Sequence, residues 1–423
     1  MKMFRLRNAG VALLAACMAF TLTSCSDDDD DKKVNTVEGR DMWGEVLRGD
    51  DMTLQFFPDH FAYYWEYTFD AGENPDLGLV IEGEFPDARF LSYNVYDDDE
   101  QTSYCEKGFS LLDVDIKAKA GNENPFVTAS GAKHQKYEIY VLPTDAPASV
   151  SAGKDNVIWF DADVKKVCTI LRYYIPQPDI KGGVAMPSVK AINVTTGEFT
   201  EAPARIASAL RGEMAIPGGA FNPSANVNFF RAPFSYAYPN GPAEYCYTRN
   251  ALEQNEVILF NFKAPSFPSS PAEFNTSDMR YWSVCVGNSQ TYTPLAISDY
   301  QTKIDANGFA NYLLADKNSA DYAKIKELAA ANDYNVLEWD GESWGKGVMV
   351  LYRNMVFADD YPHSLRKLLP VDASVSVQEI MANMQKYICV VALGQWGATG
   401  KKITTTEFIA ADGKVALRQA PQQ

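Results

Sequence analysis

The sequence predicts a mainly β protein that consists of two related sandwich units and a few short helices. Two observations carry this prediction. The second half of the chain repeats features of the first half, and the repeated segments are short alternating apolar runs that end at proline, glycine or aspartate. The chain has 423 residues, 46% of them hydrophobic and 13% aromatic, which is enough for more than one core. Many short strands with such turns favour antiparallel sandwiches or open barrels.

The N-terminus has the layout of a secretory signal. Three basic residues precede an apolar stretch over residues 11–22, and small residues lead to Cys25. The apolar run is too short for a transmembrane helix, which needs about 20 apolar residues. A cysteine at the cleavage site can accept a diacylglyceryl group, so we expect the mature protein to begin at a lipidated Cys25. Cleavage before Cys17 would leave an apolar region that is too short.

An acidic tether is expected after Cys25. Residues 27–31 are five consecutive aspartates, a pattern typical of a solvated segment. The run is similar to the acidic export signal of surface lipoproteins of the Bacteroidetes, and this resemblance implies the outer face of the outer membrane. The full chain carries a net charge of −17, and removal of the basic leader makes it more negative. Such a polyanion is a poor partner for nucleic acid or anionic lipid, so the lipid would hold it at the membrane.

The internal repeat has a period of about 180 residues. Three blocks occur in the same order in both halves, and the second copy carries about ten extra residues between the first two blocks. A repeat of this kind predicts a duplicated domain. The aligned blocks are residues 57–65 with 238–246, residues 87–95 with 278–286, and residues 156–173 with 335–353.

Period-two alternation predicts strands in these blocks, as in residues 89–95 and 280–286. Short helices are expected at residues 204–214, 321–331 and 377–386. The expected organisation is a signal peptide at 1–24, an acidic tether at 25–38, one sandwich at 39–200, and a second sandwich with added helices at 201–423.

One stretch resembles a known family. Residues 156–158 (Asn-Val-Ile), 170–176 (Ile-Leu-Arg-Tyr-Tyr-Ile-Pro) and a downstream Met-Pro are similar to an uncharacterised bacterial domain family. Its members carry an Asn-Trp-Leu-Pro element followed by an Arg-Leu-Tyr-x-Pro strand. The resemblance covers residues 80–195 and, more weakly, 270–370. It implies two tandem jelly-roll-like β-sandwich domains and no particular activity. The chain departs from the pattern because Val157 replaces the tryptophan and the proline of the first element is missing.

The cysteines and histidines limit the chemistry that we expect. Five cysteines other than Cys25 follow the leader, mostly in apolar contexts, and none forms a C-x-x-C pair. We interpret them as buried thiols, with one disulfide left open. Only three histidines occur, in separate segments, so we expect no metal site, no cofactor and no histidine-dependent catalytic triad.

Four arginines are candidate binding residues, one pair in each repeat. Arg89 and Arg280 occupy the same place in both copies, and so do Arg172 and Arg353. They could bind a carboxylate or a sugar. The alternative is structural: an arginine at a strand start, on the core side, that pairs with a nearby acid at the end of the sandwich. The parity of the strand favours this alternative for Arg89 and Arg280.

Aromatic side chains are the second candidate. Tyr64 and Trp65 belong to the densest aromatic cluster, and their rings could stack on sugars. Alternating aromatics in a strand are more often half core and half edge. Trp339 and Trp344 flank an acidic, loop-like segment, where exposed tryptophans would suit saccharide binding.

Three functions remain open from the sequence. The first is a lipid-anchored cell-surface binding protein that captures a glycan, with polysaccharide or outer-membrane transport proteins as partners. The second is a glycan- or ester-active hydrolase with its site between the domains, for which no catalytic residue can be singled out. The third is a structural or adhesive envelope lipoprotein.

Overall fold

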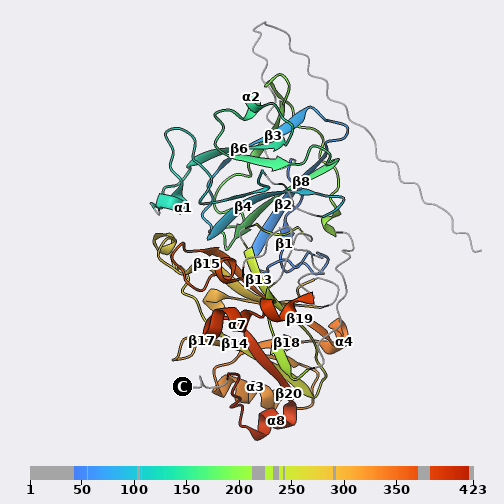
Figure 1. The fold of residues 1–423 in the computed structure, drawn as a ribbon, viewed down its shortest axis with the longest axis vertical. Helices are drawn as coiled ribbons and strands as arrows, with labels where there is room; N and C mark the ends of the chain where they lie inside the picture. Colours follow the sequence, from blue (N-terminus) through green and yellow to red (C-terminus); the bar gives the residue numbers. More distant parts are fainter. Residues whose placement is uncertain are drawn as a thin grey trace, which may run out of the picture. The chain divides into compact units, whose positions relative to one another are not determined.

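The computed structural model describes residues 42–418, except residues 55, 102–104, 106, 129, 212–223, 232–237, 242, 289–291 and 370–381. The described part is mainly β, with four five-stranded sheets and a few short helices (Figure 1). The predicted fold class is therefore confirmed. Cys25, the predicted lipidation site, lies outside the described residues.

The first half contains two sheets, called A and B. All strand pairs in them are antiparallel except β6 with β7. Sheet A has the order β1 (Leu47–Arg48), β2 (Ala62–Asp70), β8 (Lys166–Tyr174), β4 (Phe90–Asp97), β5 (Ser110–Leu112). Sheet B has the order β10 (Phe199–Thr200), β9 (Ser188–Asn193), β3 (Leu77–Glu84), β6 (Lys136–Pro143), β7 (Val157–Phe160).

The second half contains sheets C and D, in which β17 and β18 form the parallel pair. Sheet C has the order β12 (Phe230–Arg231), β13 (Ala243–Ala251), β19 (Gly347–Phe357), β15 (Met279–Gly287), β16 (Leu295–Ser298). Sheet D has the order β11 (Asn226–Asn228), β20 (Thr399–Thr404), β14 (Glu256–Lys263), β17 (Phe309–Asp316), β18 (Asn335–Trp339).

The strand pairing repeats between the halves. Sheets A and C have the same strand order, and four strands of sheet B have their counterparts in sheet D. The register repeats as well, because Tyr64 pairs with Arg172 in sheet A and Tyr245 pairs with Arg353 in sheet C. Both residues of the second pair lie 181 positions after those of the first. The outer strands β10 and β11 differ, since β10 follows its neighbour in the chain and β11 precedes its neighbour.

Three large apolar clusters hold these layers together. One lies between sheets A and B and includes Trp65, Leu171 and Tyr173. A second lies between sheets C and D and includes Trp282 and Trp339. The third lies between sheets A and C. These two sheets are therefore buried on both faces, which explains why their strands are almost continuously apolar.

Helices are short and lie outside the sheets. The helix expected at 321–331 is confirmed as α3 (Tyr322–Ala331), which packs with α8 (Thr405–Ala410) beside β20 (Figure 1). The helix expected at 204–214 is wrong over its described part, where only η1 (Ala209–Arg211) forms, and residues 377–381 of the third lie outside the described residues. The remaining helices are α1 (Pro125–Thr128), α2 (Ala148–Ser151), η2 (Pro271–Glu273), η3 (Asp299–Gln301), α4 (Gly341–Trp344), α5 (Leu365–Leu368), η4 (Met384–Tyr387), α7 (Cys389–Leu393) and η5 (Gly394–Trp396).

One disulfide joins two distant parts of the second half. It connects Cys246 on β13 with Cys389 at the start of α7, 143 positions later. The other described cysteines, Cys105, Cys168 and Cys285, are free and buried, as expected from their apolar contexts. Within the described residues, no helix is long and apolar enough to cross a membrane.

Candidate functional site

The surface where sheet A packs against sheet C, called the joint below, gathers most of the candidate residues. Period-two alternation decides which side chains reach it. On β2, Tyr64 points into the joint and Trp65 points into the core of the first half. On β8, Ile170 and Tyr174 lie in the joint, whereas Leu171 and Tyr173 lie in the core. Arg172 has the parity of the joint residues.

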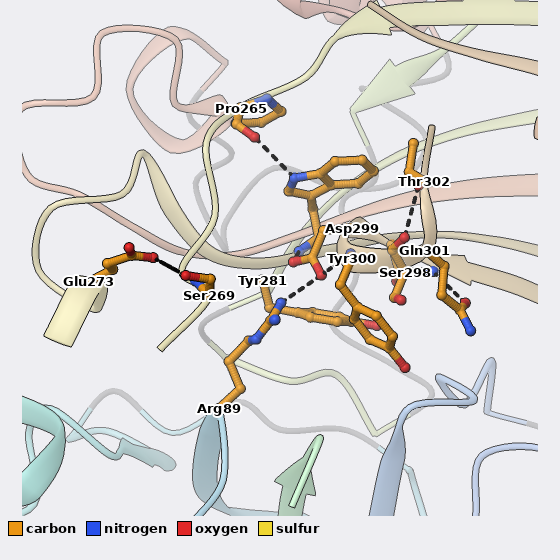
Figure 2. Close-up of polar contacts among 12 residues, drawn as sticks. Arg89, Pro265, Ser269, Glu273, Tyr281, Ser298, Asp299, Tyr300, Gln301 and Thr302 are labelled. Carbon is orange, nitrogen blue, oxygen red and sulfur yellow. Dashed lines mark hydrogen bonds and ion pairs between the residues drawn. The ribbon is translucent and has the colours of Figure 1, made fainter. Parts of the chain in front are cut away.

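Two reciprocal ion pairs cross the joint. Arg280 of the second half places Nη1 at 3.2 and 3.3 Å from the two carboxylate oxygens of Asp113 in the first half. Arg89 of the first half places Nη1 at 2.6 Å from Oδ1 of Asp299 in the second half (Figure 2). Arg89 and Arg280 are thus each paired with an acid, as the structural alternative from the sequence predicted. The acid comes from the opposite half in each case.

Both carboxylates are also held by backbone amides at equivalent positions. Asp113 accepts a hydrogen bond from the N–H of Leu91 at 3.0 Å, and Asp299 accepts one from the N–H of Trp282 at 3.2 Å. Burial raises the pKa of the Asp113 carboxyl, and it raises that of Asp299 to about 6. In both cases the arginine opposes the shift, because a nearby cation favours the charged carboxylate.

The second arginine pair donates to backbone carbonyls of the opposite half. Arg172 Nη2 donates to the carbonyl of Tyr238 at 2.8 Å, and Arg353 Nη2 donates to the carbonyl of Phe57, also at 2.8 Å. Tyr238 and Phe57 are equivalent in the repeat, and both have a positive φ, of 49° and 52°. Non-glycine residues adopt this conformation uncommonly.

The two halves differ at the next polar residue along the chain. Asp59 forms an ion pair with Arg353 at 3.3 Å and also accepts hydrogen bonds from the hydroxyls of Tyr281 and Ser283. The equivalent position in the second half is Asn240. Its side-chain oxygen accepts a hydrogen bond from Ser92 at 3.2 Å. The second half therefore carries a neutral amide at the position where the first half carries the carboxylate that pairs with Arg353.

The predicted tryptophan sites lie in the second core. Trp339 is the last residue of β18 and has no exposed surface, which differs from the exposed loop residue expected from the sequence. Its indole N–H donates to the carbonyl of Gly345 at 2.7 Å, and Trp344 packs against its ring edge-on at 5.1 Å. Trp339 thus packs as a core residue, and Trp344 in α4 is half-buried against it.

Sequence reasoning missed the three acids of the joint. A signal was present for two of them, because Asp113 follows β5 and Asp299 follows β16, the equivalent strand of the other half. Asp59 carried no such signal, since its counterpart is Asn240. Among the described residues, no group of three or more His, Cys, Asp or Glu side chains could hold a metal ion.

At the edge of the joint, partly buried side chains surround one exposed tyrosine, and this group is called the rim patch below. Tyr300 in η3 is 50% exposed, and its ring meets that of Phe61 edge-on at 5.8 Å. The guanidinium of Arg89 lies 5.7 Å from the ring centroid of Tyr300 (Figure 2) and also 5.7 Å from that of Phe267. The rim patch consists of these four residues, and it takes side chains from both halves.

Comparisons with known proteins give no family. No family model matches the chain, and no curated protein sequence matches it. It is similar in structure to an uncharacterised protein from Burkholderia cenocepacia, with a TM-score of 0.47 and 10% identity over 88% of this chain and 85% of the other. A protein from Vibrio parahaemolyticus matches with a TM-score of 0.37 and 10% identity, over 72% of this chain and 86% of the other.

Proposed function

We propose that this chain is a lipid-anchored cell-surface protein that binds a glycan without transforming it, as surface lipoproteins of the Bacteroidetes type would. The anchor is the acyl group on Cys25, and the acidic segment that follows suits export to the outer face of the outer membrane. The two sandwiches would serve as a stiff support that presents a binding surface away from the lipid. Polysaccharide, or an outer-membrane transport protein beside it, is the partner.

The rim patch is the observation that carries the proposal. Sugar rings stack on exposed aromatic faces, and Tyr300 offers half of its surface to solvent. The short helix η3 holds this residue in place, because the N–H of Ser298 donates to Oε1 of Gln301 at 3.4 Å and Thr302 Oγ1 donates to the carbonyl of Ser298 at 2.8 Å (Figure 2). A ring held in this way loses little conformational entropy when a ligand binds.

Arg89 adds polar recognition beneath the ring. One of its N–H groups is used by Asp299, and its side chain keeps 12% of its surface exposed. The other N–H groups can donate to sugar hydroxyls or to the carboxylate of a uronic acid, since a guanidinium presents five donors. The buried arginines, Arg172, Arg280 and Arg353, are committed to the joint instead.

The test is affinity electrophoresis of the mature chain through gels that contain single polysaccharides. We expect retention on at least one neutral or uronic-acid polymer and a loss of retention in Tyr300→Ala. Phe199→Ala is the matched control, because Phe199 is an exposed aromatic residue on the outer strand β10, 59% exposed and outside the rim patch. Equal retention of wild type and Tyr300→Ala would overturn the rim patch as the site.

Two further outcomes separate the competing functions. Shortened products in the gel would identify a hydrolase, and absence of both retention and turnover would favour a structural or adhesive role. The anchor is tested by Cys25→Ser, which should release the protein from the membrane fraction. Continued membrane attachment of that variant would refute lipidation at this residue.

A further inference from the structure

Arg172 is a buried cation that has no acidic partner in the described part of the chain. The residue is 2% exposed. One Nη group donates to the carbonyl of Tyr238, and the rings of Tyr64 and Tyr96 lie 5.8 and 5.6 Å from its guanidinium carbon. Its other terminal nitrogen, Nη1, is buried and has no hydrogen-bond partner. A buried charge left in this condition costs several kcal/mol.

The equivalent arginine of the second half, Arg353, has the acidic partner that Arg172 lacks among the described residues. Arg353 occupies the same place in sheet C, makes the same carbonyl contact, and is neutralised by Asp59. At the position of Asp59, the second half carries Asn240, which is 4% exposed. The amide nitrogen of Asn240, like Nη1 of Arg172, is buried without a partner. Two buried N–H groups without hydrogen-bond partners therefore occur where the other half has the carboxylate of Asp59.

Arg172 and Asn240 both line a small cavity. Its volume is about 30 Å³, and its lining includes Arg172, Asn240, Tyr64 and Tyr238. A cavity needs roughly 10–15 Å³ on this measure to admit one water-sized species, so this one holds about two or three. That is room for a monatomic anion and too little for a sugar or a phosphate ester. Arg353 also lines the cavity, but Asp59 balances its charge, so Arg172 supplies the uncompensated positive charge.

We propose that this cavity is a binding site for a single small anion, with chloride as the physiological occupant. The anion would accept hydrogen bonds from Arg172 and Asn240 and supply the negative charge that Asp59 supplies in the other half. It is a structural ligand of the joint, and it is separate from the rim patch and from glycan binding.

Stability measurements test the site directly. A ligand that binds only the folded state lowers the apparent unfolding constant about 100-fold at 100 times its Kd. We expect sodium chloride to stabilise the mature chain against urea more than sodium gluconate does at equal ionic strength, with saturation. Asn240→Asp should remove this chloride-specific gain and should be more stable than wild type in gluconate. Asn307→Asp, which adds the same charge in an exposed turn, should keep the gain.

A second measurement does not depend on any variant. Crystals of the wild-type chain soaked in sodium bromide should show an anomalous peak beside Nη1 of Arg172. A water-filled cavity with no peak would overturn the proposal. Equal stability of wild type in chloride and gluconate would also overturn it, as would a chloride gain that survives in Asn240→Asp.

Discussion

The ion pair between Arg280 and Asp113 should contribute more to stability than any other charged contact of the joint. Both side chains are almost completely buried, with 1% and 0% of their surfaces exposed. Removing one member of such a pair leaves the other charge buried without a partner, and this typically lowers the free energy of unfolding by about 3–5 kcal/mol. Arg280→Met should lose this amount, because methionine keeps much of the packing against Phe274, whose ring lies 4.2 Å from the guanidinium.

A double-mutant cycle separates the charge effect from the packing effect. Asp113→Asn alone should also lose about 3–5 kcal/mol, since it leaves Arg280 unpaired, although the asparagine oxygen can still accept from Leu91. The double variant should lose no more than either single variant, because no buried charge remains, which corresponds to a coupling energy of about 3 kcal/mol.

The assay is urea unfolding of the mature, disulfide-bonded chain, followed by tryptophan fluorescence. If the halves unfold in separate steps, the first transition is the one to compare. The matched control is the cycle of Arg89→Met with Asp299→Asn, in which the arginine side chain is 12% exposed and the coupling should be smaller. Losses for Arg280 and Asp113 that add within 0.5 kcal/mol would refute a direct interaction between the halves at this pair.

Two further predictions concern pH and the disulfide. The pKa of Asp299 is raised by burial from 3.8 to about 6, so between these values the folded state holds a proton that the unfolded state has lost. Its contribution to stability should therefore fall, by up to about 3 kcal/mol, as pH rises through this window. The free-energy difference between wild type and Asp299→Asn, measured from pH 4 to 7, should follow that curve, and a pH-independent difference would contradict it. Replacing Cys246 and Cys389 by serine should cost about 2–5 kcal/mol in the same urea assay, since the bond closes a loop of 143 positions. The variant should then be insensitive to dithiothreitol, and a wild type equally insensitive to it would argue against the bond.

Much of the fold could be predicted because the sequence offset between the two repeats is also the offset between equivalent strand pairs. The offset of 181 that aligns residues 57–65 with 238–246 also relates the strand pairs Tyr64–Arg172 and Tyr245–Arg353. Period-two alternation placed the β4 and β15 blocks as strands. The short helices were harder, because helices of three or four residues have no amphipathic period to detect.

The role of the aromatic and arginine residues could not be predicted in the same way. Sheets A and C are buried on both faces, so alternation along β2 separates two cores and does not separate core from solvent. The alternation therefore predicts an aromatic run that is half core and half edge, whereas Tyr64 and Trp65 are both buried. The acids that pair with Arg280 and Arg89 lie 167 and 210 positions away, and no local pattern reports contacts at such separations.

The joint and the proposed binding surface depend on each other. Phe61 and Arg89 come from the first half, whereas Tyr300 and Phe267 come from the second, so the rim patch exists only while sheets A and C stay in register. Asp299 serves both features, because it pairs with Arg89 and directly precedes Tyr300. A charge removed at Arg89 would therefore disturb the aromatic surface as well as the contact between the halves. Loss of glycan retention in that variant could not be assigned to a lost sugar contact, which is why Tyr300, whose ring is exposed at the edge, is the residue to change.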